Sequence, residues 1–197
     1  MSVLLLASAA ILAQSYTLHR TETLRPSDGG PERVVRQVTI ARRADGTRVE
    51  KVVSFPGQTN ESTMRTIQDG NLRLIRAFDS AGIKRTGPPV PPGDVEALKS
   101  IRPNPALDCA PRSTTARRSG SKTILGLEAA VFAVGMGEVG FAPKLGCEEV
   151  FFHPNRPDVG VKTLTQWSAG EPDSALFDVS TLREGTAEEA RRAAGIQ

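Results

Sequence analysis

The stretch that decides the fold is Arg33–Phe55, RVVRQVTIARRADGTRVEKVVSF. Its first run alternates apolar and polar residues, and one face carries Val34, Val38 and Ile40. Its second run returns in the same way, and one side carries Val49, Val53 and Phe55. Between the runs, Asp45-Gly46 accepts the positive φ of a tight hairpin turn. Because a period of two is typical of half-buried strands, the stretch predicts an antiparallel hairpin.

Strands are predicted on both sides of this hairpin. After it, residues 62–87 form an expected three-strand meander with turns at 69–71 (DGN) and 80–82 (SAG). Before it, 16–24 (YTLHRTETL) alternates imperfectly, because Arg20 and Glu22 share the parity of Tyr16 and Leu18. The period-two pattern still predicts a strand there.

Proline interrupts the sheet in the middle of the chain. The stretch 87–94, GPPVPPGD, contains four prolines, which deny amide donors to a β-ladder and favour an extended path. A short helix, DVEALKSI, is expected next with Asp94 as its N-cap, and 108–122 is predicted to be a polar loop. We therefore expect 86–122 to be a proline-rich and polar linker between two halves of a sheet.

The second half predicts further strands and a terminal helix. Residues 123–135, TILGLEAAVFAVG, predict one buried strand in which Gly126 marks a bulge or a close backbone approach. Two strands joined by a turn are expected within 136–153, and another over 159–167. Near the end, Leu176 and Phe177 are expected to pin the chain onto the sheet, and TAEEARRAAG predicts a helix capped by Thr186.

Together these segments predict a mainly β fold of the α+β kind. We expect a curved antiparallel sheet or half-barrel of meandering hairpins, with a short middle helix and a C-terminal helix. The chain has 197 residues, 39% of them hydrophobic and 24% charged, which is the size and composition of one globular domain. Residues 16–197 are expected to form this single β-rich domain.

The amino-terminal residues indicate export. Val3–Ala13 is an apolar run too short to span a bilayer but as long as a signal-peptide core. Small residues at Ala13 and Ser15 suit cleavage, so 1–15 is predicted to be a signal peptide, leaving a mature chain without a transmembrane span. A periplasmic or extracellular location would follow. A buried amino-terminal strand or helix is the alternative.

The chain's two cysteines are Cys109 and Cys147. An even pair in a chain that otherwise avoids cysteine suits an oxidising compartment, and we expect a disulfide. It would tie the stretch FAPKLGC, 141–147, to the polar loop, and Pro143 and Gly146 would make that stretch a tight turn. A reactive or metal-binding thiol is the alternative, but no CxxC partner or histidine nearby in sequence supports it.

The charge is unevenly placed along the sequence. The net charge is +3; residues 33–85 hold eleven Lys or Arg and five Asp or Glu, a net charge of +6, whereas 86–197 hold twelve and fourteen. Such a basic half could attract anionic surfaces. Its basic residues alternate with Val and Ile and are not clustered with stacking aromatics, so we expect a solvated sheet face and no nucleic-acid partner.

No motif points to catalysis, a metal or a cofactor. His19 and His153 lie on separate predicted strands without metal-ligand spacing, and no serine occurs in a nucleophile motif at a suitable place. The adjacent acids Glu148 and Glu149 are expected to point to opposite faces of a strand, which disfavours a shared acid/base site. We therefore expect a protein that is not an enzyme and has no catalytic residue, metal or cofactor.

Three segments of the second half carry a resemblance: TILG (123–126), FAPKLGC and VKTLTQWSAGEPDSALFDV (161–179). Together they look like the C-terminal half of a group of uncharacterised exported bacterial proteins. That group resembles in layout the lipoprotein carriers of the LolA/LolB kind, whose curved antiparallel sheet half-encloses a lipid. The motifs cover residues 121–179. Phe141 stands where the group often has Trp, and no ligand-binding residue is carried over.

Two functions follow as expectations. The resemblance implies an exported binding or carrier protein that holds a lipid-like ligand or another envelope component in a groove of its sheet. The alternative is an envelope structural or protein-interaction module without a small ligand. An aliphatic groove open to solvent would favour the first, and a filled core would favour the second.

Overall fold

The structure is a computed structural model that describes residues 15–26, 30–100, 109–111 and 115–195. The predicted signal peptide lies outside these residues except for Ser15. The strands are β1 (Tyr16–Leu24), β2 (Arg33–Arg42), β3 (Arg48–Ser54), β4 (Ser62–Gln68), β5 (Leu74–Phe78), β6 (Ile83–Thr86), β7 (Arg117–Ile124), β8 (Leu127–Val134), β9 (Gly137–Ala142), β10 (Glu148–Pro154), β11 (Val161–Ala169) and β12 (Arg183–Glu184). The helices are α1 (Pro92–Ser100) and α2 (Ala187–Ala193), with short 3-10 helices η1 (Asp79–Ala81), η3 (Pro143–Leu145) and η4 (Ser174–Leu176).

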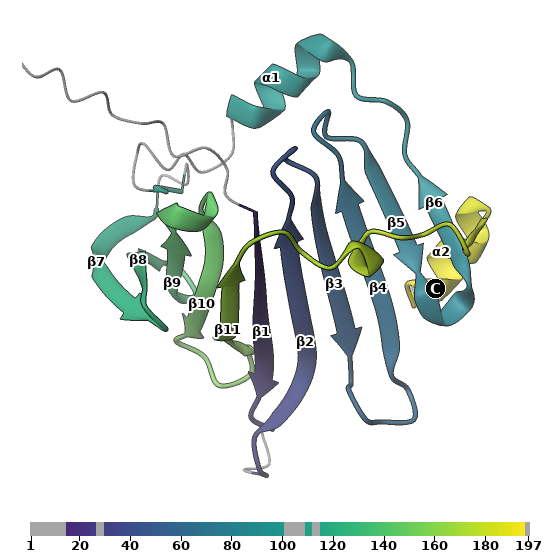
Figure 1. The fold of residues 1–197 in the computed structure, drawn as a ribbon. Coiled ribbons are helices and arrows are strands. Elements are labelled where there is room, and N and C mark those ends of the chain that lie inside the picture. Colours follow the sequence, from purple (N-terminus) through teal and green to yellow (C-terminus); the bar gives the residue numbers. More distant parts are fainter. Residues whose placement is uncertain (1–14, 27–29, 101–108, 112–114, 196–197) are drawn as a thin grey trace, which may run out of the picture.

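All twelve strands belong to one open sheet (Figure 1). Their order is β12-β6-β5-β4-β3-β2-β1-β11-β10-β9-β8-β7, so two meanders, β1–β6 and β7–β11, meet where β1 pairs antiparallel with β11. The short β12 adds to β6 in parallel. The mainly β fold class, with a short middle helix and a C-terminal helix, is confirmed.

The hairpin forms as the alternation predicts, except at Phe55: β3 ends at Ser54, and Phe55 lies outside it with a φ of 52° and 41% of its surface exposed. β2 and β3 pair antiparallel, with Val38 opposite Val52 and Ala41 opposite Val49. At the turn, the Gly46 amide donates to the Arg43 carbonyl over 3.0 Å, and Gly46 has a φ of 87°, a conformation that glycine adopts without steric cost.

The prediction of one buried strand over 123–135 is wrong. The chain turns at Leu125-Gly126, and β7 and β8 pair antiparallel on either side of it. Both turn residues have positive φ, 48° and 78°, as a two-residue type I′ hairpin requires. Gly126 is therefore a turn residue, and a Cβ there would meet nothing within 4 Å. Residues 117–122 of β7 fall in the predicted polar loop. They are exposed, so this part of the strand has no apolar alternation by which the sequence could reveal it.

The helix α1 also begins earlier than the sequence suggests. Its first residue is Pro92, a favoured residue in a first helical turn because its missing amide would have no intrahelical acceptor there. Asp94 therefore lies inside the first turn and is not the N-cap. At the other end of the chain, Thr186 caps α2 as predicted, in a reciprocal capping box with Glu189.

The stretch FAPKLGC is a tight turn, and its cysteine is bonded. Pro143–Leu145 form η3, and Gly146 ends it with a φ of 67°, its backbone N–H donating a hydrogen bond to the Pro143 carbonyl. Cys147 forms a disulfide with Cys109, with the two Cα atoms 5.3 Å apart. Leu145, 1% exposed, enters the main hydrophobic core. The turn and its disulfide thus hold residues 109–111 against the sheet.

The segment 170–182, which we call the strap, crosses one face of the sheet on its way to β12 (Figure 1, yellow-green). Three of its side chains pack onto this strap face, as predicted for two of them: Leu176, Phe177 and Val179. Beneath them lie Ala41, Val49, Ile67 and Ile75. Ala41 and Val49 are fully buried, so the strap closes a second hydrophobic core on this face.

Arg65 fastens the strap to β4. Its Nη1 donates to three strap carbonyls, those of Ala175, Leu176 and Asp178, at 3.3, 3.1 and 2.6 Å. Its Nη2 and Nε donate to the Asp79 carboxylate at 2.6 and 2.9 Å. Arg65 is 9% exposed, and these bonds satisfy a charge that would otherwise be costly to bury.

Candidate functional site

The opposite face, which we call the groove face, carries an apolar row of side chains that runs across the strands. The row consists of Val38, Val52, Met64 and Phe78, each the register partner of the next. Adjacent strands lie about 4.8 Å apart, so the row is about 14 Å long. At its β1 end the next partner is Arg20, whose own neighbour on β11 is Leu164.

A polar row runs beside the apolar one. Its members are Lys162, Glu22, Arg36, Ser54 and Ser62, again partners across successive strands. The charged members occupy β11, β1 and β2, and the serines occupy β3 and β4. The polar row is therefore charged at one end and neutral at the other.

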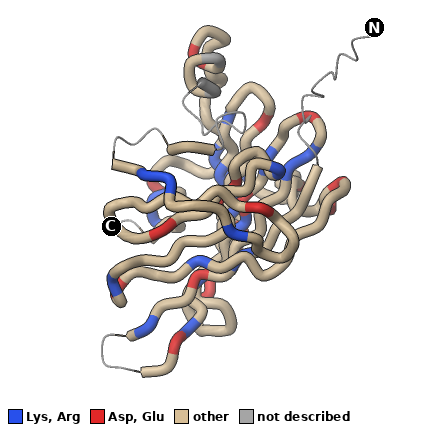
Figure 2. Tube along the Cα trace, turned by 90° about the vertical axis from the view of Figure 1, so that its left-hand side faces the viewer, with Lys and Arg blue, Asp and Glu red and all other residues tan. Residues whose placement is uncertain are grey.

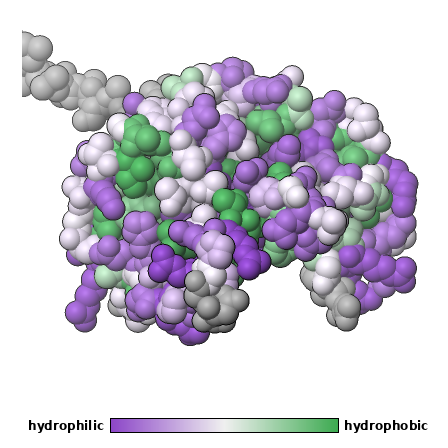
Figure 3. Space-filling view, turned by 90° about the horizontal axis from the view of Figure 1, so that it is seen from below, coloured by the Kyte–Doolittle hydropathy of each residue, from purple (hydrophilic) through white to green (hydrophobic). Residues whose placement is uncertain are grey.

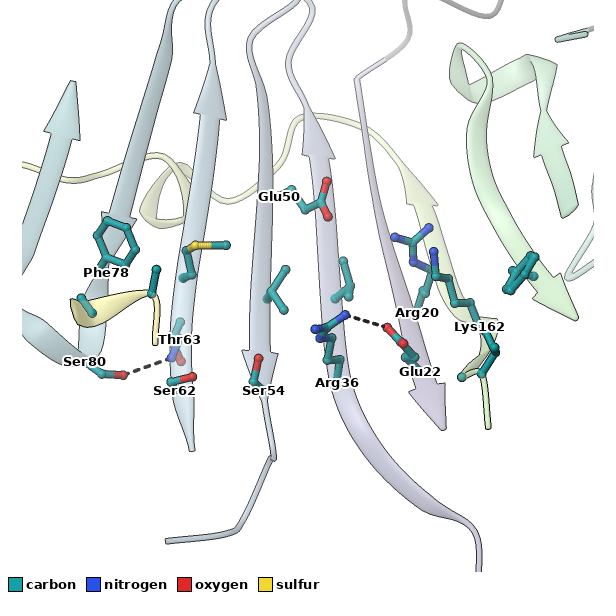
Figure 4. A pocket seen from close by; sticks show the side chains of 18 of the residues that line it. Arg20, Glu22, Arg36, Glu50, Ser54, Ser62, Thr63, Phe78, Ser80 and Lys162 are labelled. Atoms are coloured by element: carbon teal, nitrogen blue, oxygen red, sulfur yellow. Dashed lines mark hydrogen bonds and ion pairs between the residues drawn. The ribbon is translucent and has the colours of Figure 1, made fainter. Parts of the chain in front are cut away.

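Together the two rows form the floor of a groove of about 760 Å³. Met136, Phe152 and Val159 line it from the side of β10 and β11, and Ala193 and Ala194 line it at the end of α2. Figure 4 shows Phe78 at one end of this floor and Arg20 with Lys162 at the other, and the strap passes behind the sheet. Seen from below, hydrophobic residues form separate patches among hydrophilic ones (Figure 3). The groove thus offers a mixed surface.

Three charged side chains share one contact point at the β1 end of the groove. The Glu149 Oε1 lies 2.9 Å from Arg20 Nη1 and 3.0 Å from Lys162 Nζ. Arg20 Nη1 also donates to the Glu149 carbonyl over 3.1 Å. Arg20 is 9% exposed, and its Nε is buried without a hydrogen-bond partner among the described residues. Its donor capacity is therefore only partly used.

The other acids that line the groove are also paired. Glu22 Oε2 lies 3.3 Å from Arg36 Nη1, and Glu50 Oε2 lies 3.2 Å from Arg48 Nη2. Because each carboxylate has a cationic partner, the groove presents no free acid among the described residues.

A buried charge network adjoins the groove where the η3 turn covers the same face. Arg48 donates to both Glu148 oxygens, at 2.6 and 3.0 Å, and the Tyr16 hydroxyl donates to Glu148 Oε1 at 3.0 Å. Burial alone would raise the pKa of Glu148, but these bonds and the Arg48 charge hold that pKa below its usual value. Burial, with the neighbouring Glu148 carboxylate, raises the pKa of Tyr16. Both groups therefore keep their charge states at neutral pH.

The expectation that Glu148 and Glu149 point to opposite faces is wrong. Glu148 contacts Tyr16 and Glu149 contacts Arg20, and these two residues lie on the same face of β1. The cause is a register shift between Glu149 and Phe151 in the pairing of β10 with β9, because a bulge re-aims the side chains next to it.

The histidines are separate, as predicted. His19 Nδ1 lies 3.0 Å from Thr39 Oγ1, whereas the centre of the His153 ring lies 5.1 Å from that of Phe151, with the rings tilted by 44°. In the described part of the chain, no three His, Cys, Asp or Glu side chains gather as a metal site would need. No helix in that part is long and apolar enough to cross a membrane. Figure 2 shows basic and acidic positions interleaved along the strands.

The sequence carried a signal for two groove residues and none for the others. The imperfect alternation of β1, with Arg20 and Glu22 on the parity of Tyr16 and Leu18, marked two charged residues that face the groove. Met64 and Phe78 gave no comparable signal, because their place in a row depends on strand register. Lys162 joins them only through the pairing of β1 with β11.

Comparisons with known proteins give a likeness of fold. No protein-family model matches the sequence, and no curated protein matches it significantly. A solved structure of PNGF-II is similar with a TM-score of 0.51 and 13% identity, over 92% of this chain and 33% of that one. This chain thus spans about a third of PNGF-II, and the likeness concerns the fold alone. MucB, solved in complex with MucA(peri), gives a TM-score of 0.46 and 15% identity over 90% of this chain and 58% of MucB.

Proposed function

We propose that this chain is an exported, non-catalytic binding protein whose groove holds one amphipathic molecule with an apolar chain. The observation that carries the proposal is the apolar row of the groove face. Its two middle members, Val52 and Met64, are half-buried where they line the groove, between the buried Val38 and Phe78, although Ala41, Val49 and Ile67 on the strap face are all buried under the strap. The polar row runs beside it over β2, β3 and β4, so a ligand with both apolar and polar parts would be matched.

The size of the groove supports a small ligand. Ligand pockets usually measure 300 to about 1,000 Å³ and combine an apolar lining with a few polar groups, and this groove has about 760 Å³. The row from Val38 to Phe78 is about 14 Å long at the usual strand spacing, which is comparable to an extended medium-length alkyl chain. A single-chain lipid or detergent-like molecule is the class that fits.

Other features support the remaining parts of the proposal. The described lining of the groove contains no histidine or cysteine, and its acids are held in ion pairs, which supports a binding role rather than acid/base or nucleophilic chemistry. The disulfide between Cys109 and Cys147 is typical of proteins that fold in an oxidising compartment and supports export.

Calorimetric titration with decanol tests the proposal. We expect the protein to bind one decanol molecule with a negative heat-capacity change, because apolar surface is buried on binding. Met64→Arg places a charged side chain in the middle of the row and should abolish binding. Leu98→Arg is the matched control, since Leu98 is 40% exposed on α1 and does not line the groove. Absence of binding by the unmodified protein, or equal binding by the Met64→Arg variant, would contradict the proposal and favour an interaction module without a small ligand.

A further inference from the structure

We infer that the groove selects ligands with an anionic headgroup, a carboxylate or a phosphate, which Arg20 and Lys162 hold while the apolar chain extends toward Phe78. This inference rests on the proposed function and adds the chemistry and the orientation of the ligand.

The first observation is the unused capacity of Arg20. All of its hydrogen bonds to described residues leave from Nη1, and its Nε is buried with no partner in the described chain. A guanidinium carries five N–H donors in a planar fork that matches a carboxylate or phosphate. Because the residue is 9% exposed and lines the groove, an anion at this end would meet a largely desolvated cation, where charge-assisted bonds are strongest.

The second observation is that this cation pair already holds a carboxylate. Glu149 Oε1 lies within 3.0 Å of both Arg20 Nη1 and Lys162 Nζ. Lys162 is 30% exposed at its side chain, so part of its ammonium group faces solvent. One carboxylate shared by two cations leaves a net positive charge at this point, which a ligand anion would neutralise.

The third observation gives the orientation. Along the polar row the charges stop at Arg36, and Ser54 and Ser62 follow toward β4. The apolar row ends at Phe78, where Ser80 and Ala81 line the groove. Charge therefore lies at the β1 end and neutral surface at the β5 end, so the headgroup and the chain of a ligand have separate places (Figure 4).

A cationic headgroup is the less suitable occupant. Of the acids at the β1 end, Glu22 is paired with Arg36 and Glu149 with two cations. Counting these five side chains, the charged end of the groove carries three cations and two anions. A cationic ligand would have to displace a protein cation, whereas an anion would not displace a protein anion.

The test compares ligands that share one alkyl chain: decanoate, decyl phosphate and decanol, titrated into the full protein. We expect at least one of the two anions to bind about tenfold tighter than decanol, as one or two charge-assisted hydrogen bonds allow. Lys162→Gln and Arg20→Gln should lose this preference, measured in each variant as the ratio of the anion affinity to the decanol affinity. Lys162→Gln is included because its side chain is more exposed and the variant should fold normally. Arg76→Gln is the matched control, because it removes the same charge from an exposed position on β5 and should keep the preference.

The outcomes separate this inference from the proposed function. If decanol binds but neither anion binds tighter, the inference fails and the proposed function stands. If the anion preference persists in both the Lys162→Gln and Arg20→Gln variants, the headgroup lies elsewhere and the inference is overturned. If no member of the series binds, the proposed function fails and the inference with it. The tighter of the two anions identifies the headgroup as carboxylate or phosphate.

Discussion

The two faces of strands β2–β5 are built from the same hairpins but differ in what covers them. On the strap face, Ala41, Val49 and Ile67 lie under the strap and form a closed core. On the groove face, Val52 and Met64 are half-buried where they line the groove, between the buried Val38 and Phe78. Both sets are apolar and alternate with the same period. The difference shows that an apolar row becomes core or binding surface according to what covers it.

The strap face is closed by specific bonds as well as by packing. Arg65 binds three strap carbonyls, Arg43 lies 4.0 Å from the centre of the Phe177 ring, and Lys84 donates to the Val179 carbonyl over 3.0 Å. On the groove face, Leu145 of the η3 turn and Leu127 of β8 pack into the main core with Val38. Val52 and Met64 stay half-buried in the groove. Substitutions should therefore affect stability on one face and binding on the other.

The largest expected difference in the free energy of unfolding is between two variants that place the same charge on opposite faces. Val49→Asp buries an unpaired carboxylate under the strap and should cost more than about 4 kcal/mol, enough to unfold much of the protein. Val52→Asp introduces the carboxylate at a half-buried site beside solvent and should cost about 1 kcal/mol, while abolishing decanol binding. Urea denaturation measures both. Equal destabilisation by the two variants would contradict the distinction between the faces.

Removing the disulfide should have the next largest effect. The bond joins residues 38 apart, and the loss of loop-closure entropy predicts a destabilisation of roughly 4 kcal/mol. The double substitution of Cys109 and Cys147 by Ser should lower Tm and loosen the η3 turn, but leave the strap in place. Reduction of the unmodified protein should reproduce the shift. A double variant as stable as the reduced parent is expected, whereas one as stable as the oxidised parent would show that the bond contributes nothing.

Releasing the strap should lower the free energy of unfolding by less than removing the disulfide does. Arg65→Ala leaves Asp79 and three carbonyls without their donor, and the expected cost is about 3 kcal/mol. Arg76→Ala is the control on the neighbouring strand, and as an exposed substitution it should change stability by less than about 0.5 kcal/mol. Hydrogen exchange should show faster exchange within 170–182 in the Arg65 variant alone. Unchanged protection of the strap would remove Arg65 from this role.

Acid should weaken the covered part of the groove face through Glu148. Its folded pKa lies below the unfolded value of about 4.3, so its contribution is present above pH 4.3 and is lost as pH falls through the folded pKa. Glu148→Gln should cost about 2 kcal/mol at neutral pH, the size of a lost charge-assisted bond. The gap between the two proteins should narrow as pH falls below 4.3. A gap that stays constant down to pH 2 would contradict this role.

The smallest expected effect concerns α2, whose end borders the groove. Thr186→Ala removes one half of the capping box with Glu189 and should cost about 1 kcal/mol. Decanol affinity should fall slightly if at all, because Ala193 and Ala194 only border the groove. A large loss of affinity would mean that α2 contributes more of the binding surface than the rows on the sheet.

The sequence predicts those parts of the fold that depend on local pattern. The hairpin at 33–55, the turn at Pro143–Gly146, the cap at Thr186 and the packing of Leu176 and Phe177 all follow from alternation, turn chemistry or motif. β7 does not follow, because an exposed edge strand has no apolar face. The groove does not follow either, because its floor joins residues from six strands and exists only once their registers are set.

Arg65 and Arg20 show the same limit for single residues. Each is an arginine within an alternating strand, and nothing local separates a buried anchor from a solvated charge. Arg20 carried a partial signal, since it occupies the parity of Tyr16 and Leu18. The role of Arg65 depends on carbonyls within 175–178, which lie more than a hundred residues later in the sequence.

The most direct test of the groove as the binding site is methyl NMR of the methionines. The chain has three methionines, and two of them, Met64 and Met136, line the groove. Met1 falls in the predicted signal peptide, so the mature protein should give two methyl signals. Titration with decanoate should shift the Met64 methyl resonance and produce intermolecular NOEs between that methyl group and the alkyl chain, as expected for a ligand lying along the apolar row. Saturable binding of decanoate that leaves the Met64 resonance unmoved and without such NOEs would place the ligand elsewhere and contradict the account.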